Sequence, residues 1–148
     1  MPNTFFARFP IDLYRLGNKS SNKLDVIRDR DIQEMEFYRS PGCKDSKVPT
    51  GTPGEVRWVK GGPLGGISLF DDVATAPISG RFWYKIPENV TLPDGLGLYD
   101  SRKKPGKATH YTIFPTHDMP LDDFIVLLKE LARNPLIVAL FETEKTNS

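Results

Sequence analysis

The sequence of 148 residues has one cysteine, Cys43, two histidines and almost no net charge. A single cysteine excludes an internal disulfide, so folding does not depend on an oxidising compartment. One cysteine and two histidines also cannot assemble the usual four-ligand zinc site, and we expect no metal. The formal charge of +1, from 20 basic and 19 acidic residues, predicts no broad attraction to nucleic acid or to an anionic membrane.

Long apolar runs are missing as well. The longest strongly apolar run, residues 135–141, is far shorter than the roughly 20 residues that cross a bilayer as a helix. The N-terminus shows no basic segment followed by an apolar stretch, so we expect no secretory signal and no membrane partner. The content of 39% hydrophobic and 26% charged residues is typical of a globular protein, and the length fits a single domain over residues 1–148.

Proline and glycine are plentiful instead, with 13 and 12 residues spread along the chain. This pattern favours short strands joined by many turns. Residues 24–38 favour a helix through rough apolar spacing, and residues 40–53 read as a loop. Alternation and apolar runs predict strands at residues 11–16, 55–59, 67–70, 81–86, 96–99, 109–114 and 136–141.

The clearest element is a helix that follows the strand at residues 109–114. Apolar residues recur at steps of three and four from Leu121 to Ala132, which gives the segment one apolar face. Pro120 suits the first turn, and Asn134-Pro135 ends the helix. The predicted fold class is therefore α+β, rich in strands and with a few helices.

Gly65, Gly66 and Ser68 form the first candidate site. A glycine pair before a strand lets the backbone approach a ligand closely, and the Ser68 hydroxyl then forms a hydrogen bond to it. The alternative is an ordinary turn and a strand whose serine faces solvent. No Lys-Ser or Lys-Thr pair follows the glycines, so this is not a phosphate-binding loop of the Walker type.

His110 and Arg15 lie inside predicted strands. With a period of two, His110 shares a face with Thr112 and Phe114 and is suited to bind a ribose or transfer a proton. It also fits the role of a half-buried strand residue. Arg15 has apolar neighbours and needs an anionic partner, which is either a structural carboxylate or a phosphate.

Two further groups of residues carry alternatives. Phe82, Trp83 and Tyr84 offer three rings that either stack on a flat ligand or pack in the core. Glu142 and Glu144 imitate the paired glutamates of many ADP-ribosylating toxins, but they lie in a polar tail close to the end of the chain. Side chains there are rarely held firmly.

The order of several fragments resembles one toxin family, the Tse-type exported toxins of the bacterial type VI secretion system, specifically the second such effector and its relatives. The tripeptide Leu13-Tyr14-Arg15 fits the same pattern. The other matching fragments are residues 65–71, 82–87, 92–96, 99–100, 108–113 and 118–121.

This resemblance implies an ADP-ribosyltransferase-like fold, in which a mixed sheet is split around a cleft that holds NAD. It implies an NAD-dependent ADP-ribosyltransferase toxin that acts in the cytoplasm of a target cell after delivery by a secretion system. A small immunity protein neutralises such toxins. The macromolecule that accepts ADP-ribose is not indicated.

The resemblance also assigns site residues. Arg15 takes the first-strand position that meets NAD, Ser68 takes the second, and the third strand carries His110 in place of the usual glutamate. Gly65, Gly66 and one of the rings at residues 82–84 complete the NAD site. Two alternatives follow from the missing glutamate and the unknown acceptor: an NAD glycohydrolase, and a non-catalytic module that binds NAD or a partner.

Overall fold

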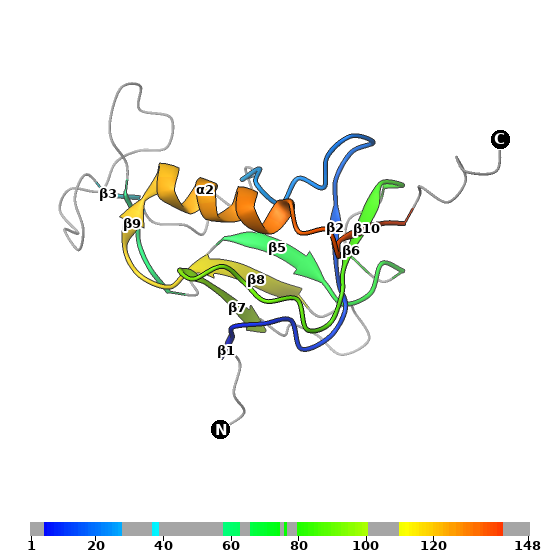
Figure 1. Ribbon diagram of the computed structural model, residues 1–148, viewed down its shortest axis with the longest axis horizontal. Helices are drawn as coiled ribbons and strands as arrows, with labels where there is room; N and C mark the ends of the chain where they lie inside the picture. Colours follow the sequence, from blue (N-terminus) through cyan, green and yellow to red (C-terminus); the bar gives the residue numbers. More distant parts are fainter. Residues whose placement is uncertain are drawn as a thin grey trace.

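The computed structural model describes residues 5–27, 37–38, 58–62, 66–74, 76, 80–100 and 110–140. Within these ranges the fold is strand-rich α+β, with a seven-stranded sheet, a three-stranded sheet and one helix (Figure 1). The larger sheet has the order β1-β7-β8-β5-β2-β6-β10. Its strands are β1 (Phe5–Phe6), β2 (Leu13–Leu16), β5 (Ile67–Phe70), β6 (Trp83–Ile86), β7 (Leu96–Asp100), β8 (His110–Pro115) and β10 (Val138–Ala139).

The smaller sheet has the order β3-β4-β9, with β3 (Phe37–Tyr38), β4 (Trp58–Val59) and β9 (Met119–Pro120). The expected α+β class is confirmed. The sheet was expected to be mixed, but the strand pairs within the described ranges are all antiparallel. None of the helical segments in these ranges is long and apolar enough to cross a membrane.

The larger sheet divides between β2 and β5. These neighbours have one paired position, Tyr14 opposite Phe70, whereas β2 pairs with β6 at four positions and β5 pairs with β8 at four. Figure 1 shows β5, β8 and β7 running together beneath the helix, while β2 and β6 take a different direction at one end. The sheet is therefore split, as the resemblance implied.

Strand positions were predicted best where apolar runs are continuous. The strand at residues 67–70 is confirmed, and β6, β7 and β8 differ from their predicted bounds by one or two residues. The helix predicted over residues 24–38 is wrong at both described ends, since residues 24–25 form a turn, residues 26–27 have no regular structure and Phe37–Tyr38 is β3. The loop predicted at residues 40–53 lies outside the described residues.

Helix α2 (Leu121–Ala132) covers one face of the larger sheet (Figure 1). Its buried residues are Phe124, Leu128 and Leu131, which repeat at steps of three and four as the sequence predicted. Pro120 is the residue before the helix rather than a member of its first turn. Acidic residues in the first turn and a lysine in the last suit the helix dipole.

The core forms two clusters on opposite faces of the sheet. The larger cluster joins α2 to buried residues such as Ile67, Leu69 and Ile113, and we call this side the helix face. The smaller cluster contains Phe70 and Trp83, which lie on the other side of the sheet. We call that side the second face.

The helix face predicts a large stability difference between two α2 residues. Phe124 is fully buried, whereas Val126 is 61% exposed. We expect Phe124→Ala to lower the free energy of unfolding by about 3–5 kcal/mol, because it leaves a cavity. Val126→Ala, the control, should change it by less than about 0.5 kcal/mol. Urea unfolding followed by circular dichroism measures both, and equal effects would contradict the assigned face of the helix.

Candidate functional site

The pairing of β5 with β8 places Ser68 and His110 on the same face. Ser68 lies opposite Thr112, and Phe70 lies opposite His110. Cross-strand partners share a face, and successive residues in a strand alternate between faces. Ser68, Phe70, His110 and Thr112 therefore all belong to the second face, whereas Ile67 and Leu69 point into the core beneath α2.

Aromatic packing holds His110 on this face. Its ring centroid lies 5.5 Å from that of Phe70, with an angle of 50° between the rings. Phe70 in turn meets Trp83 edge-to-face at 6.5 Å. A row of rings thus runs from β8 through β5 to β6. His110 is therefore supported by packing and remains partly exposed.

Gly66 is required by the fold next to this site. A Cβ at this position would collide with the main-chain oxygen of Ile113. The close approach that the sequence suggested for a ligand is therefore, at Gly66, an approach to strand β8. Gly65 lies outside the described residues.

Arg15 lies on the helix face, not with Ser68 and His110. It pairs with Tyr84 in β6, and only 1% of its surface is exposed. Its Nη1 donates to the carbonyl oxygen of Ser68 at 2.9 Å, and its Nη2 donates to those of Lys23 and Val26 at 3.1 and 2.9 Å. In these bonds, main-chain oxygens take the place that we expected an anion to occupy.

The three rings of residues 82–84 do not lie together on one face of the sheet. Trp83 is buried on the second face and donates its indole N–H to the carbonyl oxygen of Gly80 at 3.1 Å. Tyr84 is buried on the helix face, and its hydroxyl donates to the carbonyl oxygen of Asn18 at 2.8 Å. Phe82 is half-buried, with the guanidinium of Arg81 5.3 Å from its ring centre. Only Trp83 shares a face with Ser68 and His110.

Sequence reasoning missed Tyr14, which lies opposite Phe70 on the second face. Burial, and secondly the charges of Asp12 and Asp72, raise the pKa of Tyr14 above its ordinary value of 10.0. Its hydroxyl is thus protonated at neutral pH and is able to donate a hydrogen bond. The sequence did contain a signal for Tyr14: alternation along β2 puts Tyr14 and Arg15 on opposite faces, so only one of them can share the face of Ser68.

Other features lie away from this face. Asp100 is buried opposite Tyr111 on the helix face. Glu142 and Glu144 lie outside the described residues. In the part of the chain that the structure describes, no group of three histidine, cysteine or acidic residues is placed to hold a metal ion.

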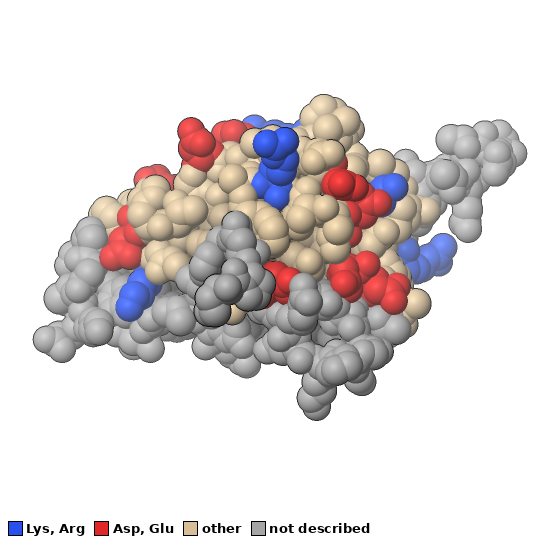
Figure 2. All heavy atoms as spheres, turned by 90° about the horizontal axis from the view of Figure 1, so that it is seen from below, with Lys and Arg blue, Asp and Glu red and all other residues tan. Residues whose placement is uncertain are grey.

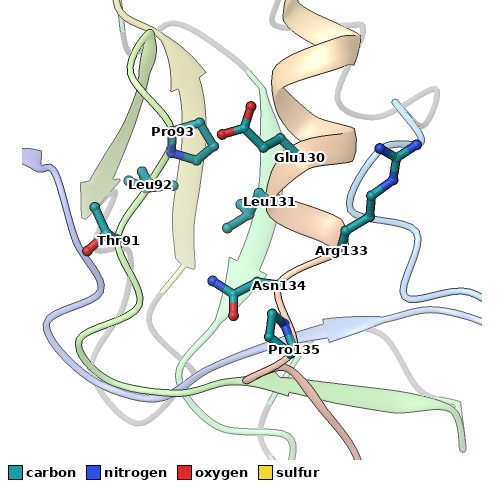
Figure 3. A pocket seen from close by; sticks show the side chains of 8 residues that line it. All are labelled: Thr91, Leu92, Pro93, Glu130, Leu131, Arg133, Asn134 and Pro135. Atoms are coloured by element: carbon teal, nitrogen blue, oxygen red, sulfur yellow. The ribbon is translucent and has the colours of Figure 1, made fainter.

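A surface hollow of about 380 Å³ lies between residues 91–93 and the end of α2. Figure 3 shows Glu130 and Asn134 pointing into it and Arg133 pointing away. It includes none of the predicted site residues. On the face drawn in Figure 2, acidic and basic side chains are interspersed with each other and with uncharged surface. The described residues thus show no broad charged patch on that face.

The chain matches the model of a known protein family. A family model described as the Tse2 ADP-ribosyltransferase toxin matches residues 12–135. The match covers well over half of the chain and includes β2, β5 and β8. No curated protein sequence matches the chain closely enough to count as a relative.

The burial of Arg15 changes the stability that we expect for the Arg15→Ala variant. The sequence alone predicted that Arg15→Ala would fold normally. Because the variant leaves buried carbonyl oxygens without their donor, we now expect the free energy of unfolding to fall by at least about 3 kcal/mol. Lys19→Ala, at an exposed position nearby, is the control and should be neutral. Urea unfolding tests this, and a fully stable Arg15→Ala protein would contradict it.

Proposed function

The chain belongs to the Tse2 ADP-ribosyltransferase toxin family, and on this basis we propose that it takes NAD as its ADP-ribose donor and acts in the cytoplasm of a target cell. The transferase activity follows from the family; the donor, the compartment and the residues are our proposal. The observation that supports the proposed site is the placement of Ser68 and His110 on one face, on paired strands.

NAD supplies a ribose whose bond to nicotinamide breaks with a build-up of positive charge on the sugar, as in glycoside hydrolysis. Ser68 binds a ribose hydroxyl and so fixes the sugar relative to β5. His110 accepts the proton of the acceptor group as that group bonds to the ribose carbon, while the electron pair of the broken bond leaves with the nicotinamide nitrogen. Histidine is the side chain best suited to accept a proton at physiological pH.

Arg15 supports this arrangement by fixing the position of the main chain at Ser68. Its bond to the carbonyl oxygen of Ser68 crosses the split in the sheet and joins residues 53 positions apart in the sequence. Catalytic groups must be held within a fraction of an ångström, so a fixed strand at Ser68 matters for rate. We therefore assign Arg15 a positioning role, instead of the direct contact with NAD phosphate that the sequence suggested.

The partners are also part of the proposal. A toxin of this kind needs a delivery route and a small immunity protein that protects the producing cell, and the acceptor is a macromolecule of the target cell. If water replaces that acceptor, the same residues make the protein an NAD glycohydrolase. If NAD binds without turnover, the chain is a binding module that has kept the fold.

His110 and His117 provide a matched test. His110 lies on the second face, whereas His117 is exposed, with its Nδ1 3.2 Å from the hydroxyl of Thr116. We expect His110→Ala to lower NAD turnover by about 10²- to 10⁴-fold, because the proton acceptor is lost. His117→Ala should match the wild type. Turnover and toxicity are measured together, with circular dichroism to confirm folding, and equal activity of the two variants would contradict the assignment.

Ser68 and the tail glutamates test the rest of the site. Ser68→Ala should reduce turnover strongly with little change in melting temperature, and Ser20→Ala, at an exposed serine, should change neither.

The double variant Glu142→Gln with Glu144→Gln should keep most activity. If the double variant is inactive and Ser68→Ala is fully active, the site includes the glutamates near the end of the chain and not Ser68. Labelled NAD incubated with cell extract separates transfer to a macromolecule from release of free ADP-ribose.

A further inference from the structure

A second row of side chains crosses the second face beside Ser68. The strand pairings place His110 opposite Phe70, Phe70 opposite Tyr14, and Tyr14 opposite Lys85. The row therefore passes from β8 to β6 through β5 and β2. Tyr14 is thus separated from His110 only by the ring of Phe70. Tyr14 lies on the same face as Ser68, whereas Arg15 lies on the helix face.

The Tyr14 side chain is available for a ligand. It is half-buried, and none of the hydrogen bonds among the described residues uses its hydroxyl. The ring of Phe70 belongs to the same apolar cluster, so the tyrosine ring is supported from one side. A supported ring whose O–H has no partner among the described residues is the type of side chain that binds flat polar heterocycles.

The charges around Tyr14 indicate the sign of the group that it binds. Asp12 and Asp72 lie near enough for their charges to act on the hydroxyl, and Lys85 lies on the side away from Phe70. The two carboxylates outnumber this one lysine, so their net charge disfavours the pyrophosphate of NAD at this point and favours its cationic pyridinium ring. The face of a tyrosine ring attracts a cation as well.

We propose that Tyr14, rather than Arg15, is the substrate-binding residue that β2 contributes, and that it binds the nicotinamide end of NAD. The inference rests on the proposed function. Its ring packs against the pyridinium ring, and its hydroxyl donates to the carboxamide oxygen. This orientation directs the bond that breaks toward Ser68 and His110, with the pyrophosphate leading away from Asp12 and Asp72.

The test compares two ligands that differ by the nicotinamide. Carba-NAD keeps the pyridinium ring but does not cleave, and ADP-ribose lacks that ring. Both are titrated by calorimetry into the wild type, Tyr14→Phe, Tyr14→Leu and the control Tyr99→Phe. Tyr99 pairs with Thr112 on the same face, but it lies in β7, on the far side of β8. Melting temperatures of all four proteins identify variants that lose structure.

We expect Tyr14→Phe to weaken carba-NAD binding by about threefold to tenfold, which corresponds to one hydrogen bond. Tyr14→Leu should weaken it further, because the ring is lost as well. Neither variant should change the affinity for ADP-ribose, and Tyr99→Phe should change neither ligand. A purely structural role would reduce the affinity for both ligands together.

Three results would overturn the inference. Unchanged carba-NAD affinity in Tyr14→Phe and Tyr14→Leu would show that the ligand does not contact Tyr14. An equal loss for carba-NAD and ADP-ribose would show that Tyr14 acts through the fold or at another part of the ligand. A wild type that binds neither ligand would overturn the proposed function and the inference with it, whereas the first two results leave NAD as the substrate.

Discussion

The join between β2 and β5 is the constraint on which the rest of the structure depends. The ladder contributes one paired position there, Tyr14 opposite Phe70. The Arg15 guanidinium adds a bond to the Ser68 carbonyl oxygen and fixes the segment after β2 through Lys23. Hydrogen bonds from a charged donor are stronger than neutral ones, and more so away from water. One buried side chain therefore holds together two halves of a sheet that the backbone joins weakly.

This join also helps to fix the residues of the second face on which the proposed site depends. Because β5 is anchored at Ser68 and then pairs with β8 over four positions, the distance between Ser68 and His110 is set by a regular ladder. The rings of Phe70 and Trp83 pack along the same face. Functional side chains on paired strands are placed more firmly than side chains on loops. The helix face, where α2 covers the larger core, carries most of the apolar burial among the described residues.

The sequence by itself determined the elements whose pattern is local. The helix bounds at Leu121 and Ala132 followed from apolar spacing, and the strand at residues 67–70 followed from a short apolar run. The same reasoning selected Ser68 and His110, and the order of the fragments identified the family. The helix predicted over residues 24–38 was wrong at its described ends. Phe37–Tyr38 is held in β3 by pairing with the distant β4, and such a contact overrides a weak helical preference.

Only the tertiary structure decided which first-strand residue lies on the same face as Ser68 and His110. Alternation in β2 says that Tyr14 and Arg15 point in opposite directions, but not which of them faces α2. That choice depends on the register of β2 against β5 and β6, and so on contacts between residues more than fifty positions apart. Register is set by burial of a whole face. The family pattern indicated Arg15, whereas the packing of the sheet buried Arg15 and placed Tyr14 opposite Phe70, on the same face as His110.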